Sequence, residues 1–308
     1  MKNILITGIN GFVGNHLLNE LTKCGYTVSG VGREERCSQK LKNYYNINLN
    51  DSIKLNAIDF SQIDAIIHLA GLAAVGPSFN NPKLYLNTNM NIEVNLYEMC
   101  VKQDVRPLFL IISSGSLYSP TQKLPLKENS RIDPSSPYAV SKVGQEELAK
   151  YYRKRGFKCI IARPFNHIGP GQALGFITSD LAYQIFDCLK NKKNELLVGN
   201  LSAKRDYTDV RDIARGYRLL IEKGCDGEVY NLCSGTSYSG ETILNKMLSN
   251  VSSKTSFNII QDLSKYRSVD VDNIYGSYKK INKATNWKPS ISLDQSIEDV
   301  MKYWKDLG

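Results

Sequence analysis

The sequence predicts an α/β fold, a doubly wound parallel sheet with a smaller, discontinuous α/β lobe. Short apolar runs alternate with amphipathic helical patterns in the first half of the chain, which is typical of a parallel sheet covered on both faces. Beyond Arg163 the pattern changes, because prolines and glycines crowd the stretch 164–175. A chain of 308 residues also exceeds the usual size of a single core, which favours a second lobe.

The expected strands of the sheet are the apolar runs at 4–7, 27–31, 65–69, 108–113 and 159–163. A helix with Leu17, Leu18 and Leu21 on its apolar face follows the first strand, and Gly25 is expected at its C′ position. Two more helices are expected at about 89–101 and 138–154. Later elements are shorter: helices near 181–189, 213–222 and 293–304, and strands near 196–198 and 229–232. The predicted sheet domain covers 1–165 plus about 206–233, and the second lobe covers about 166–205 and 234–308.

The net charge of +9 comes from 39 basic and 30 acidic residues. A basic surface suits nucleic acid, but it equally attracts dinucleotides and nucleotide sugars, and lysine-rich segments such as 279–283 explain it by composition alone. The apolar runs are too short to span a membrane. Because the N-terminus lacks a signal-peptide pattern, we expect a cytoplasmic protein. The seven cysteines form no Cys-x-x-Cys pair and are expected to be reduced, and three histidines without ligand spacing predict no metal site.

Three glycines, Gly8, Gly11 and Gly14, follow the first strand and open the first helix. This spacing allows a tight turn, a close approach of the backbone to a pyrophosphate, and close packing of helix on strand. The phosphates would lie at the positive N-terminus of the helix. The context therefore favours a Rossmann-like dinucleotide site over a purely structural glycine turn.

The end of the second strand carries information on the cofactor. An acidic residue there would bind the adenosine ribose hydroxyls of NAD. This chain has Gly32 and Arg33 instead, and a guanidinium suits a 2′-phosphate, so we predict NADP(H) in preference to NAD(H). In the alternative, Arg33 is a solvated loop charge and both cofactors are accepted.

Tyr138 and Lys142 begin a helix just after a Pro-Ser-Ser-Pro turn. Their i, i+4 spacing places the phenol and the ammonium on one helical face, where the lysine cation would lower the pKa of the tyrosine for acid–base work. Ser114 ends a buried strand, at the edge where a parallel sheet presents its active site. We therefore predict Ser114, Tyr138 and Lys142 as the catalytic residues for carbonyl chemistry. The alternative is an ordinary surface helix with an ordinary strand-end serine.

These motifs, in this order, resemble the extended short-chain dehydrogenase/reductase family, which acts mainly on nucleotide sugars. His68-Leu-Ala-Gly71, Asn89, Arg163-Pro-Phe-Asn166 and Trp287-Lys-Pro289 match landmarks of the same family, over essentially the whole chain. The resemblance implies that Ser114 hydrogen-bonds the substrate carbonyl, Tyr138 donates the proton and Lys142 also holds the nicotinamide ribose. It implies cofactor-binding roles for Gly8, Asn10, Gly11, Phe12, Val13, Gly14, Arg33, Asn48, Leu49, Leu69, Ala70, Gly71, Asn89, Tyr138, Lys142 and Pro164. It implies substrate-binding roles for Ser114, Ser116, Asn166, Arg205 and Arg267, the two arginines on the diphosphate.

Within the family, the stretches 162–172, 205–212 and 229–235 are similar to GDP-4-keto-6-deoxy-mannose reductases and to related reductases of GDP-6-deoxy-4-keto-heptose. The resemblance implies NADPH-dependent reduction of the C4 keto group of a GDP-4-keto-6-deoxy sugar. The family's dehydratases carry an Asp-Glu pair where this chain has Gly115-Ser116, so dehydration is disfavoured. Asn48 and Ile92 depart from common family residues, an aspartate and a glycine.

Three further expectations follow from the resemblance and the charge. A nucleotide-sugar 4-epimerase is the nearest alternative activity, because it belongs to the same family. A non-catalytic cofactor-sensing or nucleic-acid-binding protein is the alternative from another class, although such a protein would not need Ser114, Tyr138 and Lys142 together. Relatives pair the two helices expected at about 89–101 and 138–154 across a dimer interface, so we expect a homodimer without nucleic acid or membrane partners.

Overall fold

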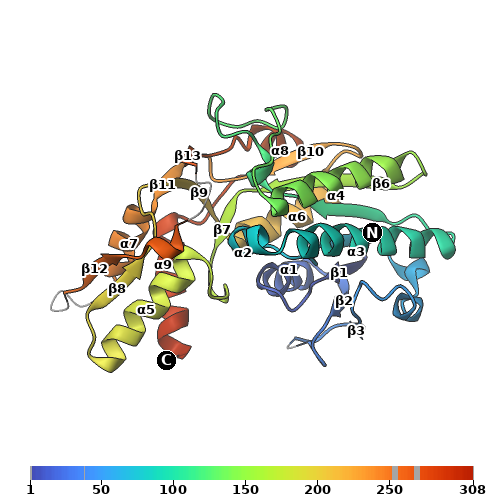
Figure 1. Ribbon diagram of the computed structural model, residues 1–308. Coiled ribbons are helices and arrows are strands. Elements are labelled where there is room, and N and C mark those ends of the chain that lie inside the picture. Colours follow the sequence, from blue (N-terminus) through green and yellow to red (C-terminus); the bar gives the residue numbers. More distant parts are fainter. Residues whose placement is uncertain (1, 38, 252–255, 267–270, 308) are drawn as a thin grey trace.

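The computed structural model describes residues 2–37, 39–251, 256–266 and 271–307. Its centre is a parallel sheet with strand order β10-β6-β5-β4-β1-β2-β3 (Figure 1). The strands are β1 (Asn3–Thr7), β2 (Thr27–Gly32), β3 (Tyr44–Asn46), β4 (Ala65–His68), β5 (Leu108–Ile112), β6 (Lys158–Pro164) and β10 (Val229–Leu232). Every neighbouring pair in this sheet is parallel, so the predicted fold class is confirmed.

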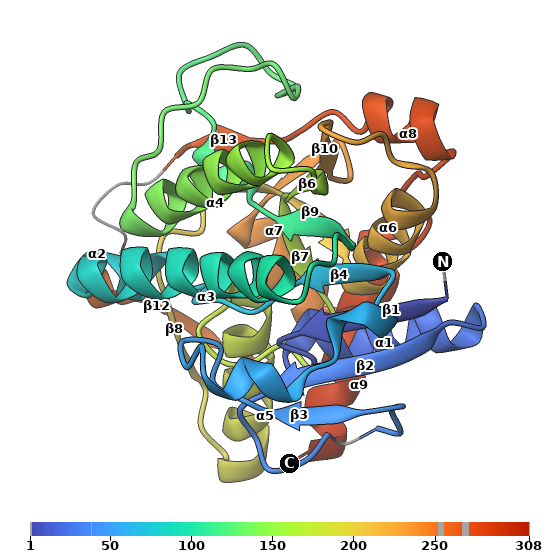
Figure 2. The ribbon, with the colours of Figure 1, turned by 90° about the vertical axis from the view of Figure 1, so that its right-hand side faces the viewer.

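Helices cover both faces of the sheet. On one face, α1 (Phe12–Lys23) and α6 (Val210–Lys223) bury a shared apolar cluster against the strands. On the other face, α3 (Pro82–Lys102) and α4 (Pro137–Arg153) lie side by side, as Figure 2 shows. The strands are buried on both sides, which explains their continuous apolar runs. None of the described helices is long and apolar enough to cross a membrane.

The strand order reverses at β1, which pairs with β2 on one side and β4 on the other. Thr7 of β1 is opposite His68 of β4, and His68 is opposite Ile111 of β5. The loops that follow these three strands therefore leave the sheet at the same edge. In open α/β sheets a ligand binds at this edge, beside the point where the order reverses.

The remaining elements gather beside the sheet (Figure 1). One small sheet contains β7 (Asn166–Ile168), β9 (Lys204–Asp209), β11 (Ser237–Ser239) and β13 (Asn273–Ile274), and another pairs β8 (Glu195–Val198) with β12 (Asn258–Gln261). Helices α5 (Ile177–Asn191), α7 (Gly240–Leu248) and α9 (Leu293–Leu307) pack together over an apolar cluster of their own. The short helices α2 (Val75–Asn80) and α8 (Lys279–Thr285) complete the described helical elements, with 3₁₀ turns at Lys54–Ala57, Phe60–Gln62, Gly115–Leu117 and Leu263–Lys265.

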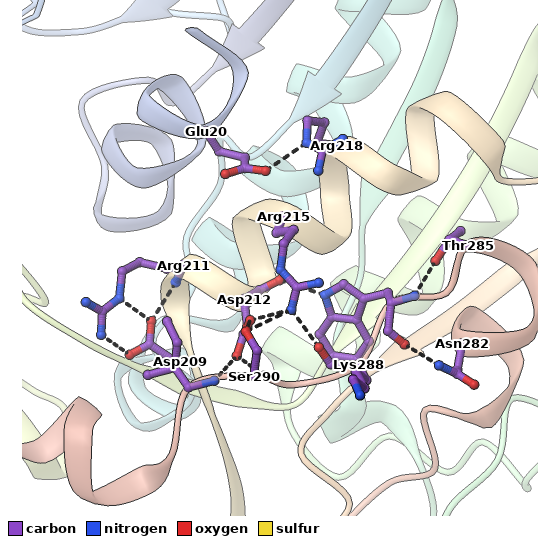
Figure 3. A network of polar contacts seen from close by, with 12 residues as sticks. Glu20, Asp209, Arg211, Asp212, Arg215, Arg218, Asn282, Thr285, Lys288 and Ser290 are labelled. Atoms are coloured by element: carbon purple, nitrogen blue, oxygen red, sulfur yellow. Dashed lines mark hydrogen bonds and ion pairs between the residues drawn. The ribbon is translucent and has the colours of Figure 1, made fainter. Parts of the chain in front are cut away.

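A polar network holds the C-terminal segment against α6 (Figure 3). The carboxylate of Asp212 accepts hydrogen bonds from the backbone N–H groups of Ser290 and Ile291 at 2.7 and 2.9 Å, and it pairs with Arg215. Trp287 is fully buried and donates its indole N–H to the carbonyl of Asp212 at 2.9 Å. The predicted Trp287-Lys-Pro289 motif thus has a structural role, because it connects α6 with the C-terminal segment.

Most predicted elements lie where the sequence placed them, but the start of α3 differs. Helix α3 begins at Pro82 rather than at 89, because Pro82 starts the helix and only Tyr85 is buried before Asn89. Several short elements were not predicted: α2, α7, α8, β3, β7, β9, β11, β12 and β13. The division into a sheet domain and a second lobe, with the boundaries given above, stays a prediction.

Candidate active site

The glycine loop joins β1 to α1 with the geometry that a pyrophosphate site requires. Gly8 has φ +70°, and its backbone N–H donates to the carbonyl of Val31 at 2.8 Å. A Cβ on Gly14 would lie 2.3 Å from the carbonyl oxygen of Ile9, so any side chain there would push the helix away from the loop. The backbone at the N-terminus of α1 therefore remains accessible to an anionic ligand.

Polar groups surround Gly32 at the end of β2. The carboxylate of Glu34 turns back toward the glycine loop and accepts hydrogen bonds from the amide of Asn10 at 2.8 Å and from the backbone of Arg33 at 3.1 Å. Tyr44 approaches the same amide at 3.1 Å. These contacts lower the pKa of Glu34, the bond from Asn10 having the largest effect. The side chain of Arg33 is exposed, so a carboxylate and a guanidinium both lie at the predicted ribose end of the site.

Ser114 and Tyr138 lie together at the carboxyl edge of the sheet. Ser114 caps the 3₁₀ turn after β5, and its hydroxyl accepts a hydrogen bond from the backbone of Ser116 at 3.1 Å. Tyr138 lies in the first turn of α4, which Ser136 caps through the backbone N–H of Ala139. A hydrogen bond with Ser114 lowers the pKa of Tyr138, but burial is the larger effect and raises it. The prediction that the pKa of Tyr138 is lowered is wrong in this structure, because burial outweighs the hydrogen bond with Ser114.

The ammonium of Lys142 is nearly buried and points toward β5. It donates hydrogen bonds to the carbonyl of Ile112 at 2.7 Å and to Oε1 of Gln145 at 2.8 Å. Its Nζ lies 5.9 Å from the centre of the Tyr138 ring. Burial lowers the pKa of Lys142 to about 8, while the nearby carboxyl groups of Glu93 and Glu146 act in the opposite direction.

A buried ion pair anchors α4 to the sheet. The guanidinium of Arg163 on β6 makes two bonds to the carboxylate of Glu146, at 2.8 and 2.6 Å. The hydroxyl of Ser113 donates to the same carboxylate at 2.5 Å, and Arg163 also reaches the hydroxyl of Tyr118. Since Glu146 lies one turn beyond Lys142, this pair fixes the position of α4 relative to the end of β5.

Asn89 is fully buried behind the loop that follows β4. Its side chain accepts from the backbone N–H of Leu72 at 2.8 Å, donates to the carbonyl of the same residue at 3.2 Å and donates to the hydroxyl of Ser141 at 2.9 Å. A Cβ on Gly71 would lie 3.0 Å from its Oδ1. Asn89 thus connects the loop after β4 with α4. Its contact with the cofactor stays a prediction.

The other predicted cofactor residues line the same edge. Phe12 and Val13 form the first turn of α1, Leu69 and Ala70 follow β4, and Pro164 ends β6. Asn48 is exposed in the turn after β3, where its side chain accepts a bond from the backbone of Asn50, and Leu49 beside it is buried. The predicted cofactor residues that the structure describes therefore extend from the glycine loop to α4, which carries Tyr138 and Lys142.

Two of the predicted substrate residues, Asn166 and Arg205, lie on the neighbouring small sheet, whereas Ser114 and Ser116 lie at the turn after β5. Asn166 is exposed on β7, opposite Tyr207 of β9, and Arg205 lies on β9 with its guanidinium bonded to the carbonyl of Val271. Strand β7 passes close to the start of α1, where His167 stacks on Phe12 with ring centres 6.0 Å apart. Arg267 lies outside the described residues, so its pairing with Arg205 stays a prediction.

Sequence reasoning missed three groups at this site: Glu34, Glu93 and Gln145. The signals were present, because Glu93 follows Asn89 by one helical turn and Gln145 follows Lys142 by three residues. Among the residues that the structure describes, no group of His, Cys, Asp and Glu side chains could hold a metal ion.

Comparisons with known proteins identify a family and several proteins that this chain resembles. The sequence model of the family described as GDP-mannose 4,6 dehydratase matches residues 5–300. The GDP-6-deoxy-D-mannose reductase of Pseudomonas aeruginosa is 32% identical, over 99% of this chain and 97% of that protein. A putative UDP-glucose 4-epimerase of Methanocaldococcus jannaschii is 28% identical, over 98% of both chains. A solved structure of RMD from Pseudomonas aeruginosa complexed with NADPH superimposes with a TM-score of 0.88 and 30% identity, covering 100% of both chains.

Proposed function

The chain belongs to the GDP-mannose 4,6 dehydratase family, within the extended short-chain dehydrogenase/reductases, and we propose that it is an NADPH-dependent 4-ketoreductase of a GDP-4-keto-6-deoxy sugar. Its relatives are reductases, epimerases and dehydratases of nucleotide sugars, so it is an NAD(P)-dependent enzyme. The observation that carries the proposal is the meeting of Ser114, Tyr138 and Lys142 at the sheet edge that also carries the glycine loop.

The residues present fit a dinucleotide. A Cβ on Gly8 or on Gly14 would meet backbone atoms at 3.0 and 2.3 Å, so only glycine leaves this cradle open. Arg33 would hold the 2′-phosphate of NADP(H), and Lys142 would hold the nicotinamide ribose. We propose NADP(H) as the preferred cofactor, with NAD(H) accepted, since RMD binds NADPH. When bound, the reduced nicotinamide supplies the hydride for C4 of the sugar.

The side chains of this site supply the proton. Ser114 would hydrogen-bond the C4 carbonyl oxygen and stabilise the negative charge that develops on it. Tyr138 would donate its phenolic proton to that oxygen, and burial keeps this proton in place at neutral pH because it raises the pKa of the phenol. The Lys142 ammonium would then stabilise the phenolate that remains.

The structure around Gly115 supports reduction rather than dehydration. A Cβ on Gly115 would lie 2.9 Å from the ring of Phe165, so the acidic side chain that dehydratases carry at this position has no room here. The next residue is Ser116, whose hydroxyl lies 2.8 Å from that of Ser114. Among the described residues, Gly115 and Ser116 therefore supply no acid–base pair for eliminating water, and Tyr138 is the proposed proton donor for the carbonyl.

An epimerase is the second candidate, because a putative UDP-glucose 4-epimerase is also similar over the whole chain. The two activities differ in their net consumption of NADPH, because an epimerase returns its hydride to the sugar and a reductase does not. We would incubate the protein with GDP-4-keto-6-deoxy-mannose and NADPH and follow absorbance at 340 nm, with Tyr138→Phe as the control. We expect NADPH loss in the wild type alone, whereas UDP-glucose turnover without NADPH loss would favour the epimerase.

Exposed apolar side chains on α3 and α4 support the proposal of a homodimer. Leu84 of α3 and Val140 and Tyr151 of α4 are large apolar side chains exposed by 54%, 43% and 53%. The two helices lie side by side on the outer face of the sheet (Figure 2). Pairing this face with that of a second copy would give the four-helix contact of a homodimer. Light scattering coupled to size exclusion tests this, and a monomer would contradict it.

A further inference from the structure

Glu93 is a buried carboxyl group that the proposed reaction does not use. It lies in the middle of α3, its exposed fraction is 0%, and its carboxylate oxygens make no well-formed hydrogen bond, although the side chain of Gln145 is close enough to lower its pKa. A glutamate is rarely fully buried without a partner, because removing its charge from water is costly. Such a residue needs an explanation in terms of its surroundings.

The register of α3 against α4 places Glu93 behind the catalytic lysine. The bond from Asn89 to Ser141 fixes how the two helices face each other. One turn further along both helices, Glu93 follows Asn89 and Gln145 follows Ser141. Gln145 accepts a hydrogen bond from Lys142 at 2.8 Å, so the glutamate faces the residue that holds the ammonium.

Other titratable groups surround this carboxyl. Glu146 approaches it from α4, Tyr97 from its own helix and Cys159 from β6. The Glu146 carboxylate is already committed to Arg163 through a bidentate ion pair. Of the two carboxyl groups near Lys142, Glu93 is therefore the one with no guanidinium of its own among the described contacts.

We propose that Glu93 is a positioning residue that acts on Lys142. From its place on α3 it supplies a negative charge, which keeps the buried lysine a cation under alkaline conditions. A protonated carboxyl costs less to bury than a carboxylate does. As the pH rises it ionises, and its charge then offsets the tendency of the buried ammonium to lose its proton. The pair extends the pH range over which the catalytic tyrosine has a cation beside it.

The electrostatics agree with this geometry. Burial raises the pKa of Glu93 well above its usual range, while the charge of Lys142 acts in the opposite direction. On the lysine, burial lowers the pKa, and Glu93 has the largest opposing effect. His68 of β4 also faces the lysine, but burial lowers the pKa of His68 to about 3, so it stays neutral and supplies no charge.

The first test uses no substrate and compares the thermal stability of Glu93→Gln with that of the wild type. Because folding raises the pKa of Glu93, its contribution to stability is fully present below the unfolded pKa and is lost as the pH rises. The amide does not titrate, so the melting temperature of the variant relative to the wild type should rise from about pH 5 to about pH 8. A difference that stays constant over this range would overturn the proposal.

The control is Glu98→Gln, which removes a carboxylate from the same helix. Glu98 lies at the surface, where its bonds to Tyr152 and Arg155 lower its pKa. It is therefore already ionised at about pH 5 in both the folded and the unfolded state. The stability difference of this variant should not change over the same range, which separates loss of charge from loss of the buried carboxyl.

The second test is the pH profile of kcat, and it rests on the proposed reductase function. We expect the alkaline limb of Glu93→Gln to move down by about one pH unit, which corresponds to a tenfold loss of activity on that limb. Activity on the acid side of neutral pH, below the moved limb, should be unchanged, and so should the alkaline limb of Glu98→Gln. An unmoved limb in Glu93→Gln would overturn the proposal. A wild type that reduces no GDP-4-keto sugar would overturn the proposed function instead, and the stability test would still decide the state of Glu93.

Discussion

The side chain of Asn89 on α3 donates a hydrogen bond to the hydroxyl of Ser141 on α4 at 2.9 Å. The same amide also satisfies both backbone groups of Leu72, in the loop after β4. One buried residue thus connects the predicted cofactor loop with the helix that carries Tyr138 and Lys142. The positions of the catalytic side chains depend on this connection.

Replacing Asn89 with alanine should impair both stability and catalysis. The change leaves the N–H and the carbonyl of Leu72 without partners, and each buried unsatisfied group costs about 1–3 kcal/mol. Urea denaturation and kcat measure the two effects. Asn95→Ala is the control, because Asn95 on the same helix makes one bond, to the carbonyl of Leu49 at 2.8 Å. Equal losses in the two variants would contradict a special role for Asn89.

Replacing Gly14 with alanine should disrupt the cofactor cradle. The new Cβ would lie 2.3 Å from the carbonyl oxygen of Ile9, which is backbone and cannot turn aside. We expect a loss of about 1–3 kcal/mol in the free energy of unfolding, together with weaker binding of NADPH. Gly76→Ala is a matched control, since a Cβ there meets nothing within 4 Å. Unchanged NADPH affinity in Gly14→Ala would contradict the assignment of the loop.

Arg33 and Glu34 should act in opposite directions on cofactor choice. Removing the guanidinium with Arg33→Ala should weaken NADPH binding, and removing the carboxylate with Glu34→Gln should strengthen it, each by up to about fivefold for exposed charges. NADH affinity should fall in Glu34→Gln, since a carboxylate can accept bonds from the ribose hydroxyls. Titrations of nicotinamide fluorescence measure both, with Glu35→Gln as the charge control. Parallel changes for the two cofactors would rule out discrimination at this position.

Lys142→Met should change the pH dependence of stability. Burial lowers the pKa of Lys142 to about 8, below the unfolded value of about 10.4. The contribution of the lysine is therefore present above the unfolded value and lost as the pH falls through about 8. The melting temperature of the variant relative to wild type should be higher at about pH 7 than at about pH 10. The opposite trend would show that the folded protein holds the lysine proton more tightly than the unfolded chain does.

The sheet, and the meeting of Ser114 with the helix that carries Tyr138 and Lys142, could be predicted from the sequence because their patterns are local. The alternation of strands and helices, the glycine spacing and the pair at Tyr138 and Lys142 can each be read within a few residues. The start of α3 was missed since the stretch before Asn89 buries only Tyr85, so its helicity depends on packing against the rest of the molecule.

The electrostatics of the site could not be predicted in the same way. A lysine four residues from a tyrosine suggests a lowered pKa for the phenol, but the result depends on burial, which tertiary packing decides. The role of Glu93 likewise depends on the register between α3 and α4, which are separated by the 34 residues between Lys102 and Pro137. The predicted substrate residues Asn166 and Arg205 lie in a separate small sheet, and the predicted residue Arg267 lies outside the described residues.

The central claim is net transfer of hydride from NADPH to C4 of a GDP-4-keto-6-deoxy sugar, with Tyr138 as the proton donor. The most direct measurement uses NADPH deuterated at the transferred position, followed by NMR of the purified sugar product. The account predicts one deuterium at C4 from the wild type and a loss of about 10²–10⁴-fold in rate for Tyr138→Phe, which should still bind NADPH. Product without deuterium at C4, or a Tyr138→Phe variant as active as the wild type, would contradict it.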